Sequence, residues 1–391
     1  MHDVFMSRQP LVNRQSKIIA TRLALHYSPE ATVIDAVEML GGMASIWPAS
    51  AKPIFVTSGR TGCEAAILDW PAPENAAIEL PATLLTGAEG ADVINTLQTF
   101  QPTVCLHFDP QAAQALASGV RFRFIGFDAQ RFQISQLKVL AARTRACGIA
   151  IAFNVTSNEQ FQACVEAGVT AAAGWFFTSP AQTTAKALSP GQANIVRVLN
   201  LVRSNADIRE IEAALKVDVA ISYKLLRYIN AAGFGLSCEI QSFRHAVTML
   251  GYEKLNRWLS LLLGTASKAP MAPALMHTAL LRGRLMELLA TGLVEKSEYD
   301  NLFITGAFSL LDVLLGVDME RALEAMRLPE PICEALLGRG GRYQPFLDLA
   351  LTSETDDGPA IAEQAAMLGL TADRFNRVQL QALSFADAME L

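Results

Sequence analysis

The first half of the chain alternates short apolar runs with amphipathic stretches. From Pro53 onward the apolar runs begin roughly 20–26 residues apart, which fits a strand, a crossover helix and two short loops. About eight such runs predict a compact (β/α) barrel rather than an open sheet. The predicted strands are Val4–Met6, Ile18–Ala20, Pro53–Val56, Ala77–Leu80, Val104–Leu106, Phe124–Phe127, Ile149–Phe153 and Ala171–Phe177.

The second half has a helical period throughout, and no strand pattern competes with it. It follows a linker, Ser179–Asn194, that is rich in Ala, Thr, Pro and Gly. Asp207 with Glu210 three residues later is typical of a helix start. We therefore predict two domains, a (β/α) barrel over residues 1–188 and an all-helical domain over residues 189–391. Helices are predicted over residues 208–216, 219–230, 252–263, 272–294, 299–315 and 318–327.

Composition narrows the class of protein. Half of the 391 residues are apolar and 18% are charged, so the chain has ample material for packed cores. It contains no apolar run long enough to predict a membrane span, and its first ten residues lack the apolar core of a signal peptide. The six cysteines include no Cys-x-x-Cys pair, which argues against a structural zinc site or a disulfide framework. We expect a protein of a reducing cytoplasm.

The net charge is −6, and neither half of the chain has an excess of basic residues. Nucleic-acid binding needs a positive surface that displaces counterions. The charge therefore predicts no nucleic-acid partner.

Several motifs resemble the EAL–HDOD family of bacterial signalling proteins, the YuxH-like regulators, over nearly the whole chain. Phe5–Leu11 is similar to the family's first strand with its Arg-Gln-Pro motif, and Ala173–Pro180 is similar to its closing motif. Asp218–Ala232 is similar to the HDOD signature, as are Ile240–Ser242 and the later Leu250-Gly251. The resemblance implies an EAL-type barrel followed by an all-helical HDOD domain.

Active EAL domains hydrolyse cyclic di-GMP with two divalent cations, which need several oxygen ligands at the C-terminal ends of barrel strands. The resemblance places Arg22, within Arg22-Leu23-Ala24, at the glutamate of Glu-Ala-Leu. It places Thr57 at the ligand asparagine of the next strand. The following glutamate is retained as Glu79.

The remaining positions of the family's site are also changed. Its paired aspartates fall at His107 and Phe108, with Asp109 one place off. Its catalytic lysine falls at Gly126, although the aspartate two residues later matches Asp128. Its late glutamate and glutamine fall at Phe153 and Ala173.

These changes predict a barrel without phosphodiesterase activity. Arginine keeps its charge in proteins, so the positive charge of Arg22 would lie where a metal ion should bind. Glu79 alone could not bind two divalent ions. We expect Glu79 to be a buried carboxylate paired with Arg22 from an adjacent strand. We expect His107 to be hydrogen-bonded at a strand end and Asp128 to bond backbone or cap a turn. No metal or cofactor is predicted.

Two further groups of residues are candidate binding sites. Gln9 and His26 match positions that contact the dinucleotide in the family, but His26 replaces an arginine and weakens the phosphate contact. Lys224, Arg227 and Tyr228 lie off the apolar face of the signature helix and are a candidate partner surface. A docking role for them between the two domains is the alternative.

The resemblance implies a non-catalytic signal transduction protein that acts through protein partners in or near cyclic di-GMP signalling. A cyclic di-GMP receptor that binds without cleaving is one alternative, and a residual phosphodiesterase is another. The sequence leaves the partner's identity and a homodimer open.

Overall fold

A computed structural model describes residues 3–59, 62–179, 190–216, 251–252, 256–257, 259–260, 271–324, 326 and 328–389. The chain divides into two compact units. The first contains residues up to Phe177 together with Leu351–Leu380, and the second contains Thr178–Ala350 with the chain's last residues.

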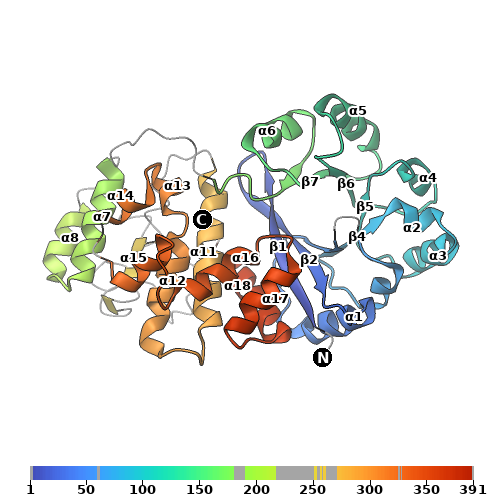
Figure 1. Cartoon of the computed structure of the whole chain (residues 1–391). Coiled ribbons are helices and arrows are strands. Elements are labelled where there is room, and N and C mark those ends of the chain that lie inside the picture. Colours follow the sequence, from blue (N-terminus) through green and yellow to red (C-terminus); the bar gives the residue numbers. More distant parts are fainter. Residues whose placement is uncertain are drawn as a thin grey trace. The chain divides into compact units, whose positions relative to one another are not determined.

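The first unit is a closed eight-stranded barrel with strands in sequence order, as Figure 1 shows. The first strand is antiparallel to both of its neighbours, and all the other pairs are parallel. The predicted barrel is thus confirmed. Its strands are β1 Val4–Asn13, β2 Ile18–Tyr27, β3 Ile54–Ser58, β4 Ala76–Pro81, β5 Val104–His107, β6 Phe124–Asp128, β7 Ile149–Phe153 and β8 Ala171–Ala173.

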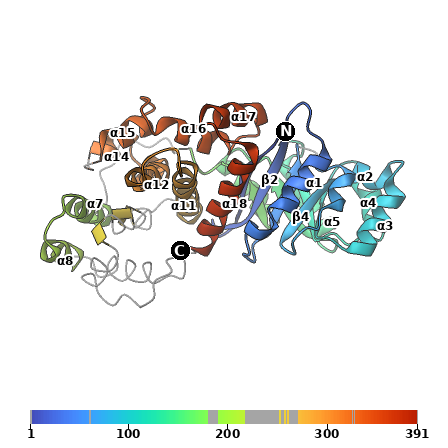
Figure 2. The ribbon, with the colours of Figure 1, turned by 90° about the horizontal axis from the view of Figure 1, so that it is seen from below.

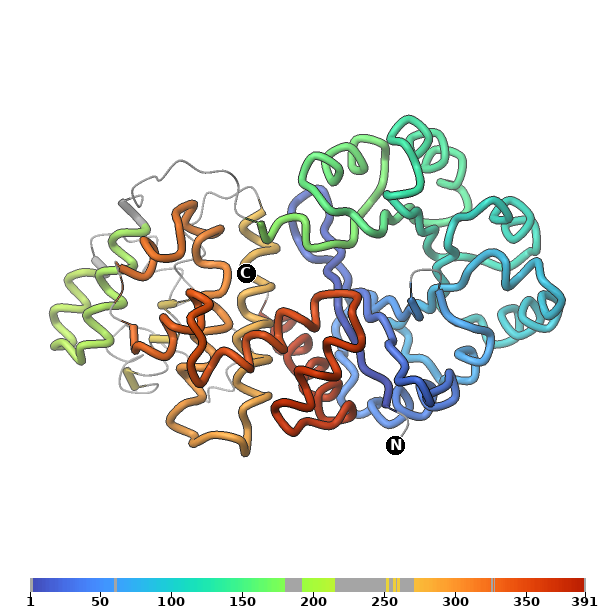
Figure 3. Tube along the Cα trace, viewed as in Figure 1, coloured from blue at the N-terminus to red at the C-terminus, as the bar shows by residue number. Residues whose placement is uncertain are grey.

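Short helical segments follow strands β2 to β7, and Figure 3 traces this path along the chain. Their ends carry local caps where the sequence allows: the hydroxyl of Ser157, for example, accepts a hydrogen bond from the backbone N–H of Gln160 at 3.1 Å. The segments are α1 Val33–Gly42, η1 Ala44–Ile46, η2 Ala65–Asp69, α2 Ala82–Thr86, α3 Gly90–Phe100, α4 Ala112–Leu116, α5 Ile134–Thr144 and α6 Asn158–Glu166.

The barrel interior mixes aromatic rings with very small side chains. Phe55 and Phe124 pack with ring centroids 4.8 Å apart, and alanines from β2, β4 and β8 leave room for them. Alternating large and small residues fill a narrow barrel without voids. The interior around these side chains is therefore a packed core.

Three strands of the structure differ in length from those predicted from the sequence. The predicted runs at Val4–Met6 and Ile18–Ala20 are the beginnings of two ten-residue strands joined by a tight turn. Polar residues continue both strands, because the pairing of β1 with β2 satisfies their backbone groups. The run from Ala171 to Phe177 forms only a three-residue strand, because Gly174 then leaves the sheet with a φ of 150°.

The predicted domain boundary also differs from the structure. The expected boundary at residue 188 lies outside the described residues, but Leu351–Leu380, expected in the helical domain, belongs to the barrel unit. This segment holds α17 Gly358–Met367 and the first half of α18 Ala372–Ala388. Figures 1 and 2 both show α17 and α18 beside β1 and β2. Hydrogen bonds to β1 hold the segment there.

The second unit is helical throughout its described part, as the periodicity predicted. The predicted helix over residues 299–315 is broken at Ser309. The predicted helix over residues 272–294 ends earlier, at Leu289, and the one over residues 318–327 is helical at Met319–Glu324. Its helices are α7 Pro190–Arg203, α8 Ile208–Lys216, α11 Ala272–Leu289, η4 Lys296–Glu298, α12 Tyr299–Phe308, α13 Leu311–Leu315, α14 Met319–Glu324 and α15 Glu330–Leu336, followed by α16 Gln344–Thr352, which runs into the segment of the barrel unit.

Candidate functional site

The site residues predicted from the sequence lie together inside the upper half of the barrel. Side chains alternate across a strand, so the residue two positions above each core residue also points inward. Arg22 stands above Ala20 on β2, Thr57 above Phe55 on β3, and Glu79 above Ala77 on β4, and all three are buried. The strand register thus turns scattered sequence positions into one layer.

A bidentate ion pair forms the centre of this layer. Arg22 Nε donates to Glu79 Oε1 and Arg22 Nη2 donates to Glu79 Oε2, both at 2.8 Å. The predicted pairing is therefore confirmed. The strands are not adjacent as expected, because β3 lies between β2 and β4, and its Thr57 hydroxyl is 3.5 Å from Arg22 Nη2.

The ion pair sets the protonation state of both groups. Burial alone would raise the pKa of Glu79, but attraction to Arg22 and a hydrogen bond from His107 outweigh it and lower this pKa to about 2. Burial opposes the charge on Arg22, yet the carboxylate of Glu79 raises the pKa of that guanidinium above its ordinary value. Both side chains are therefore charged at neutral pH.

His107 and Phe153 complete the cluster from β5 and β7. His107 Nε2 lies 2.7 Å from Glu79 Oε2, so the predicted hydrogen-bonded histidine is confirmed. Its ring stacks on Phe153 with centroids 5.2 Å apart. The Arg22 guanidinium also lies over the Phe153 ring, 4.6 Å from its centroid. The phenyl ring thus contacts both groups that pair with Glu79.

Gly126 on β6 provides the space for that ring. A Cβ atom at Gly126 would lie 2.3 Å from Cε2 of Phe153 and 3.3 Å from the sulfur of Cys105. Any side chain here, including the lysine of the family pattern, would collide with Phe153. The sequence alone does not show that Gly126 and Phe153 are in contact, because no local signal links residues on different strands.

The stability of the barrel should depend on pH through Glu79. Its folded pKa is lowered from 4.5 to about 2, so its contribution is complete above pH 4.5 and is lost as pH falls toward 2, roughly 3 kcal/mol in all. We expect Glu79→Gln to be less stable than the native protein at pH 7. The two should converge between pH 4.5 and 2 in urea titrations. A difference that stays constant over that range would contradict the shift.

A pocket of about 290 Å³ opens beside the cluster at the ends of β4, β5 and β6. His107, Asp109, Asp128 and Arg131 line it, and Arg131 Nε lies 3.4 Å from Asp128 Oδ2. Asp128 also accepts a hydrogen bond from the backbone N–H of Gln130 at 2.9 Å, so its predicted role at the turn is confirmed. Phe108 lines the pocket as well. The pocket is therefore mixed in charge.

The two candidate dinucleotide contacts lie on the β1–β2 side. Gln9 pairs with Arg22 in the strand register, and its buried Oε1 has no hydrogen-bond partner among the described residues. His26 Nε2 is 2.8 Å from the hydroxyl of Ser7. Burial lowers the pKa of His26, although nearby Asp356 and Asp357 oppose this, so the ring is neutral at pH 7. Ala173 is wholly buried in the core.

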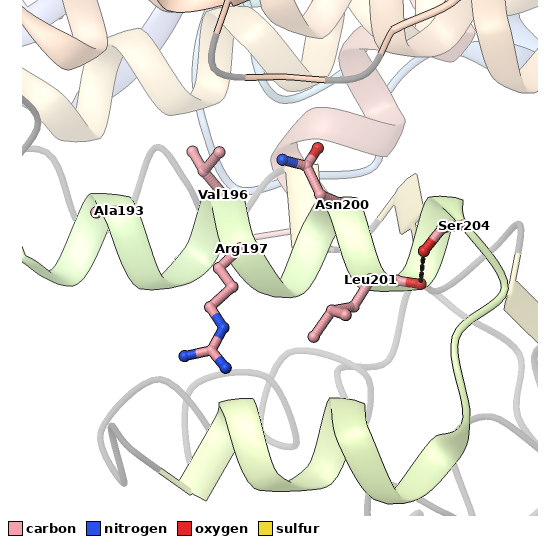
Figure 4. A pocket seen from close by; sticks show the side chains of 6 residues that line it. All are labelled: Ala193, Val196, Arg197, Asn200, Leu201 and Ser204. Atoms are coloured by element: carbon pink, nitrogen blue, oxygen red, sulfur yellow. Dashed lines mark hydrogen bonds between the residues drawn. The ribbon is translucent and has the colours of Figure 1, made fainter.

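The predicted partner residues Lys224, Arg227 and Tyr228 lie outside the described residues. The helical unit offers another hollow, of about 360 Å³, along α7. Figure 4 shows Arg197 and Leu201 projecting from α7 toward α8, while Val196 and Asn200 project from the opposite side. A dashed line marks the bond from the Ser204 hydroxyl to the Leu201 carbonyl, 3.0 Å long.

No group of three or more His, Cys, Asp or Glu side chains in the described part of the chain is placed to hold a metal ion. Within the same residues, no helix is both long and apolar enough to cross a membrane.

Comparison with known families identifies the helical unit. The model of the HDOD domain matches residues 190–310, so the chain carries an HDOD domain after a closed eight-stranded barrel. This combination supports the EAL–HDOD arrangement that the sequence motifs predicted.

Two curated proteins are similar to the chain. It is 28% identical over 233 residues to the cyclic di-GMP phosphodiesterase CdgJ of Vibrio cholerae serotype O1, covering 59% of this chain and 54% of that protein. It is 27% identical over 223 residues to the uncharacterized protein YuxH of Bacillus subtilis, covering 55% and 53%. The chain therefore matches about half the length of each curated relative.

Among solved structures, the chain is similar to the EAL domain of FimX from Pseudomonas aeruginosa bound to cyclic di-GMP. The identity is 15%, the match covers 46% of this chain and 91% of that one, and the TM-score is 0.33.

Proposed function

We propose that this chain is a non-catalytic signal transduction protein in or near cyclic di-GMP signalling that works by binding protein partners. One observation carries the proposal. The upper layer of the barrel, where an EAL phosphodiesterase would bind metal, is filled by the buried Arg22–Glu79 pair and the ring of Phe153.

The chemistry of this layer does not fit two divalent cations. Both oxygens of Glu79 already accept hydrogen bonds from Arg22, and one also bonds His107. A hard cation would need several free oxygen ligands, and the fixed charge of the guanidinium would repel it. The residues of this layer therefore do not fit a metal-dependent hydrolysis.

The comparisons supply the signalling context. The similarity to CdgJ, which is named as a cyclic di-GMP phosphodiesterase, supports a place in or near that pathway. The HDOD domain supports the helical unit as the part that binds proteins. A barrel that keeps its fold without its metal ligands is compatible with such a scaffold.

We expect the purified chain to release no product from cyclic di-GMP with either Mg²⁺ or Mn²⁺. The layer keeps only Glu79 of the family's metal-binding carboxylates and has Gly126 in place of the catalytic lysine. Product would be followed by chromatography against a control without enzyme. Arg22→Glu should also be inactive, since Thr57, Phe108, Gly126 and Phe153 still lack the required groups. Turnover that disappears in Glu79→Ala would overturn the proposal.

We expect titration calorimetry with cyclic di-GMP to show no binding at micromolar concentrations of protein. The guanidinium of Arg22 is already paired with Glu79, and His26 is neutral and 13% exposed. Binding with a measurable heat that His26→Ala abolishes would favour the receptor alternative instead. Such a result would leave the absence of hydrolysis untouched, so the two experiments separate the two functions.

A further inference from the structure

The upper half of β1 has an open edge. β8 is only three residues long and pairs with β1 only at Leu11–Asn13. Above that point Gly174 donates its backbone N–H to the carbonyl of Pro10 at 3.2 Å, and β8 then ends. Among the described residues, no strand lies beside Val4–Arg8 on this side, although this backbone is buried. Buried backbone groups need hydrogen-bond partners.

Side chains of α18 supply those partners. The amide of Asn376 accepts from the N–H of Met6 at 3.0 Å and donates to the carbonyl of Val4 at 2.7 Å. Gln379 Nε2 donates to the carbonyl of Met6 at 2.7 Å. Together these bonds replace the ladder that a neighbouring strand would make. Asn376 is wholly buried, so the interaction is not a surface contact.

Arg8 fastens the same segment. Its backbone N–H donates to the carbonyl of Ser353 at 2.9 Å. Its guanidinium donates to Ser353 Oγ at 2.5 Å, to Gln379 Oε1 at 2.9 Å and to Glu354 Oε1 at 2.8 Å. The side chains of Arg8 and Glu354 are only 3% and 7% exposed. A buried ion pair with this many hydrogen bonds requires both partners, since either charge alone would be costly.

The segment then passes over the rim of the barrel. Asp357 caps α17 by accepting from the N–H of Ala360 at 3.0 Å, and Asp356 Oδ1 lies 3.8 Å from His26 Nε2. Gly358 lies so close to His26 that a Cβ atom there would be 2.5 Å from the Cβ of the histidine. His26 is thus covered by the start of α17 and faces two carboxylates.

We propose that Leu351–Leu380 is a covering segment of the barrel, fastened by Arg8 to the open edge of β1, that closes the rim over His26 to ligands. Helices follow strands β2 to β7, but the described residues after β8, up to Ser179, contain none. The end of the chain provides this cover, and the HDOD domain is inserted between the two parts of the barrel unit. Any anionic ligand of the rim must displace the segment and its acidic residues first.

Native-state hydrogen exchange on the full chain tests the fastening without any substitution. We expect the amides of Met6 and Arg8 to open together with residues 351–380, with the same dependence on low urea concentrations and before the amides of β4 to β7. Retained protection of these two amides while the segment exchanges would overturn the proposal.

Arg8→Gln tests the role of the guanidinium, with Arg14→Gln as the matched control because Arg14 is exposed in the turn after β1. We expect Arg8→Gln to speed exchange in residues 351–380 and at Met6 by ~10-fold or more while β4 to β7 keep their rates. Arg8→Lys should restore part of the protection. Equal acceleration in every strand, or none in the segment, would show that Arg8 fastens nothing locally.

Labelling by diethyl pyrocarbonate tests the closed rim. The rate of His26 modification, followed by mass spectrometry, should be low in the native chain and in Arg14→Gln, and should rise ~10-fold or more in Arg8→Gln as local opening exposes the ring. Glu354→Gln removes the same ion pair from the other partner and should act in the same direction. Fast labelling of His26 in the native chain would overturn the rim closure.

Discussion

Arg22→Met should lower the free energy of unfolding of the barrel by about 3–5 kcal/mol, because it leaves the carboxylate of Glu79 buried without its cation. Glu79→Leu should cost a similar amount by leaving Arg22 unpaired. The double substitution should recover much of the loss, since two apolar side chains of similar volume need no partners. Fluorescence during urea unfolding reports on the barrel through Trp47, Trp70 and Trp175.

The control for this cycle is Arg131→Met. Arg131 also forms an ion pair in the barrel unit, with Asp128, but its side chain is 59% exposed, so its loss should cost less than about 1 kcal/mol. Additive effects of Arg22→Met and Glu79→Leu would contradict the coupling, and a cost for Arg22→Met no larger than the control's would show that burial does not govern this pair.

Asn376→Ala should destabilise the barrel by roughly 2–6 kcal/mol, because it leaves the N–H of Met6 and the carbonyl of Val4 without partners, at ~1–3 kcal/mol for each buried group. Alanine favours the helical conformation. The loss should therefore come from the two backbone groups of β1 and not from a weaker helix. Urea denaturation measures the difference directly.

Asn95→Ala is the matched control, because Asn95 lies on an exposed position of α3. It should change the free energy of unfolding by no more than about 0.5 kcal/mol in either direction. If Asn376→Ala behaved like Asn95→Ala, the side chain would not act as the missing strand partner, and the open edge of β1 would have to be satisfied in another way.

The two parts of the site differ in how far the sequence predicted them. The identities of Arg22 and Glu79, at positions where the family pattern has two carboxylates, indicate a buried ion pair from the sequence alone. The fit of Phe153 over Gly126 was not indicated, because it depends on the stagger of two strands. The covering of His26 was not indicated either, since 345 residues separate Arg8 from Ser353.

The sequence by itself determined the types of element and their buried faces. Apolar runs at regular intervals predicted the strands, the helical period predicted the second unit, and both depend on local alternation that each segment carries within itself. The tertiary structure decided which distant groups meet. β1 is antiparallel to its neighbours and is longer than β8, so part of its edge needs other hydrogen-bond partners. Asn376 and Gln379 of α18, more than 360 residues away in the sequence, supply them. Backbone groups demand partners wherever they are buried, but the chain's local pattern does not say from how far away those partners come.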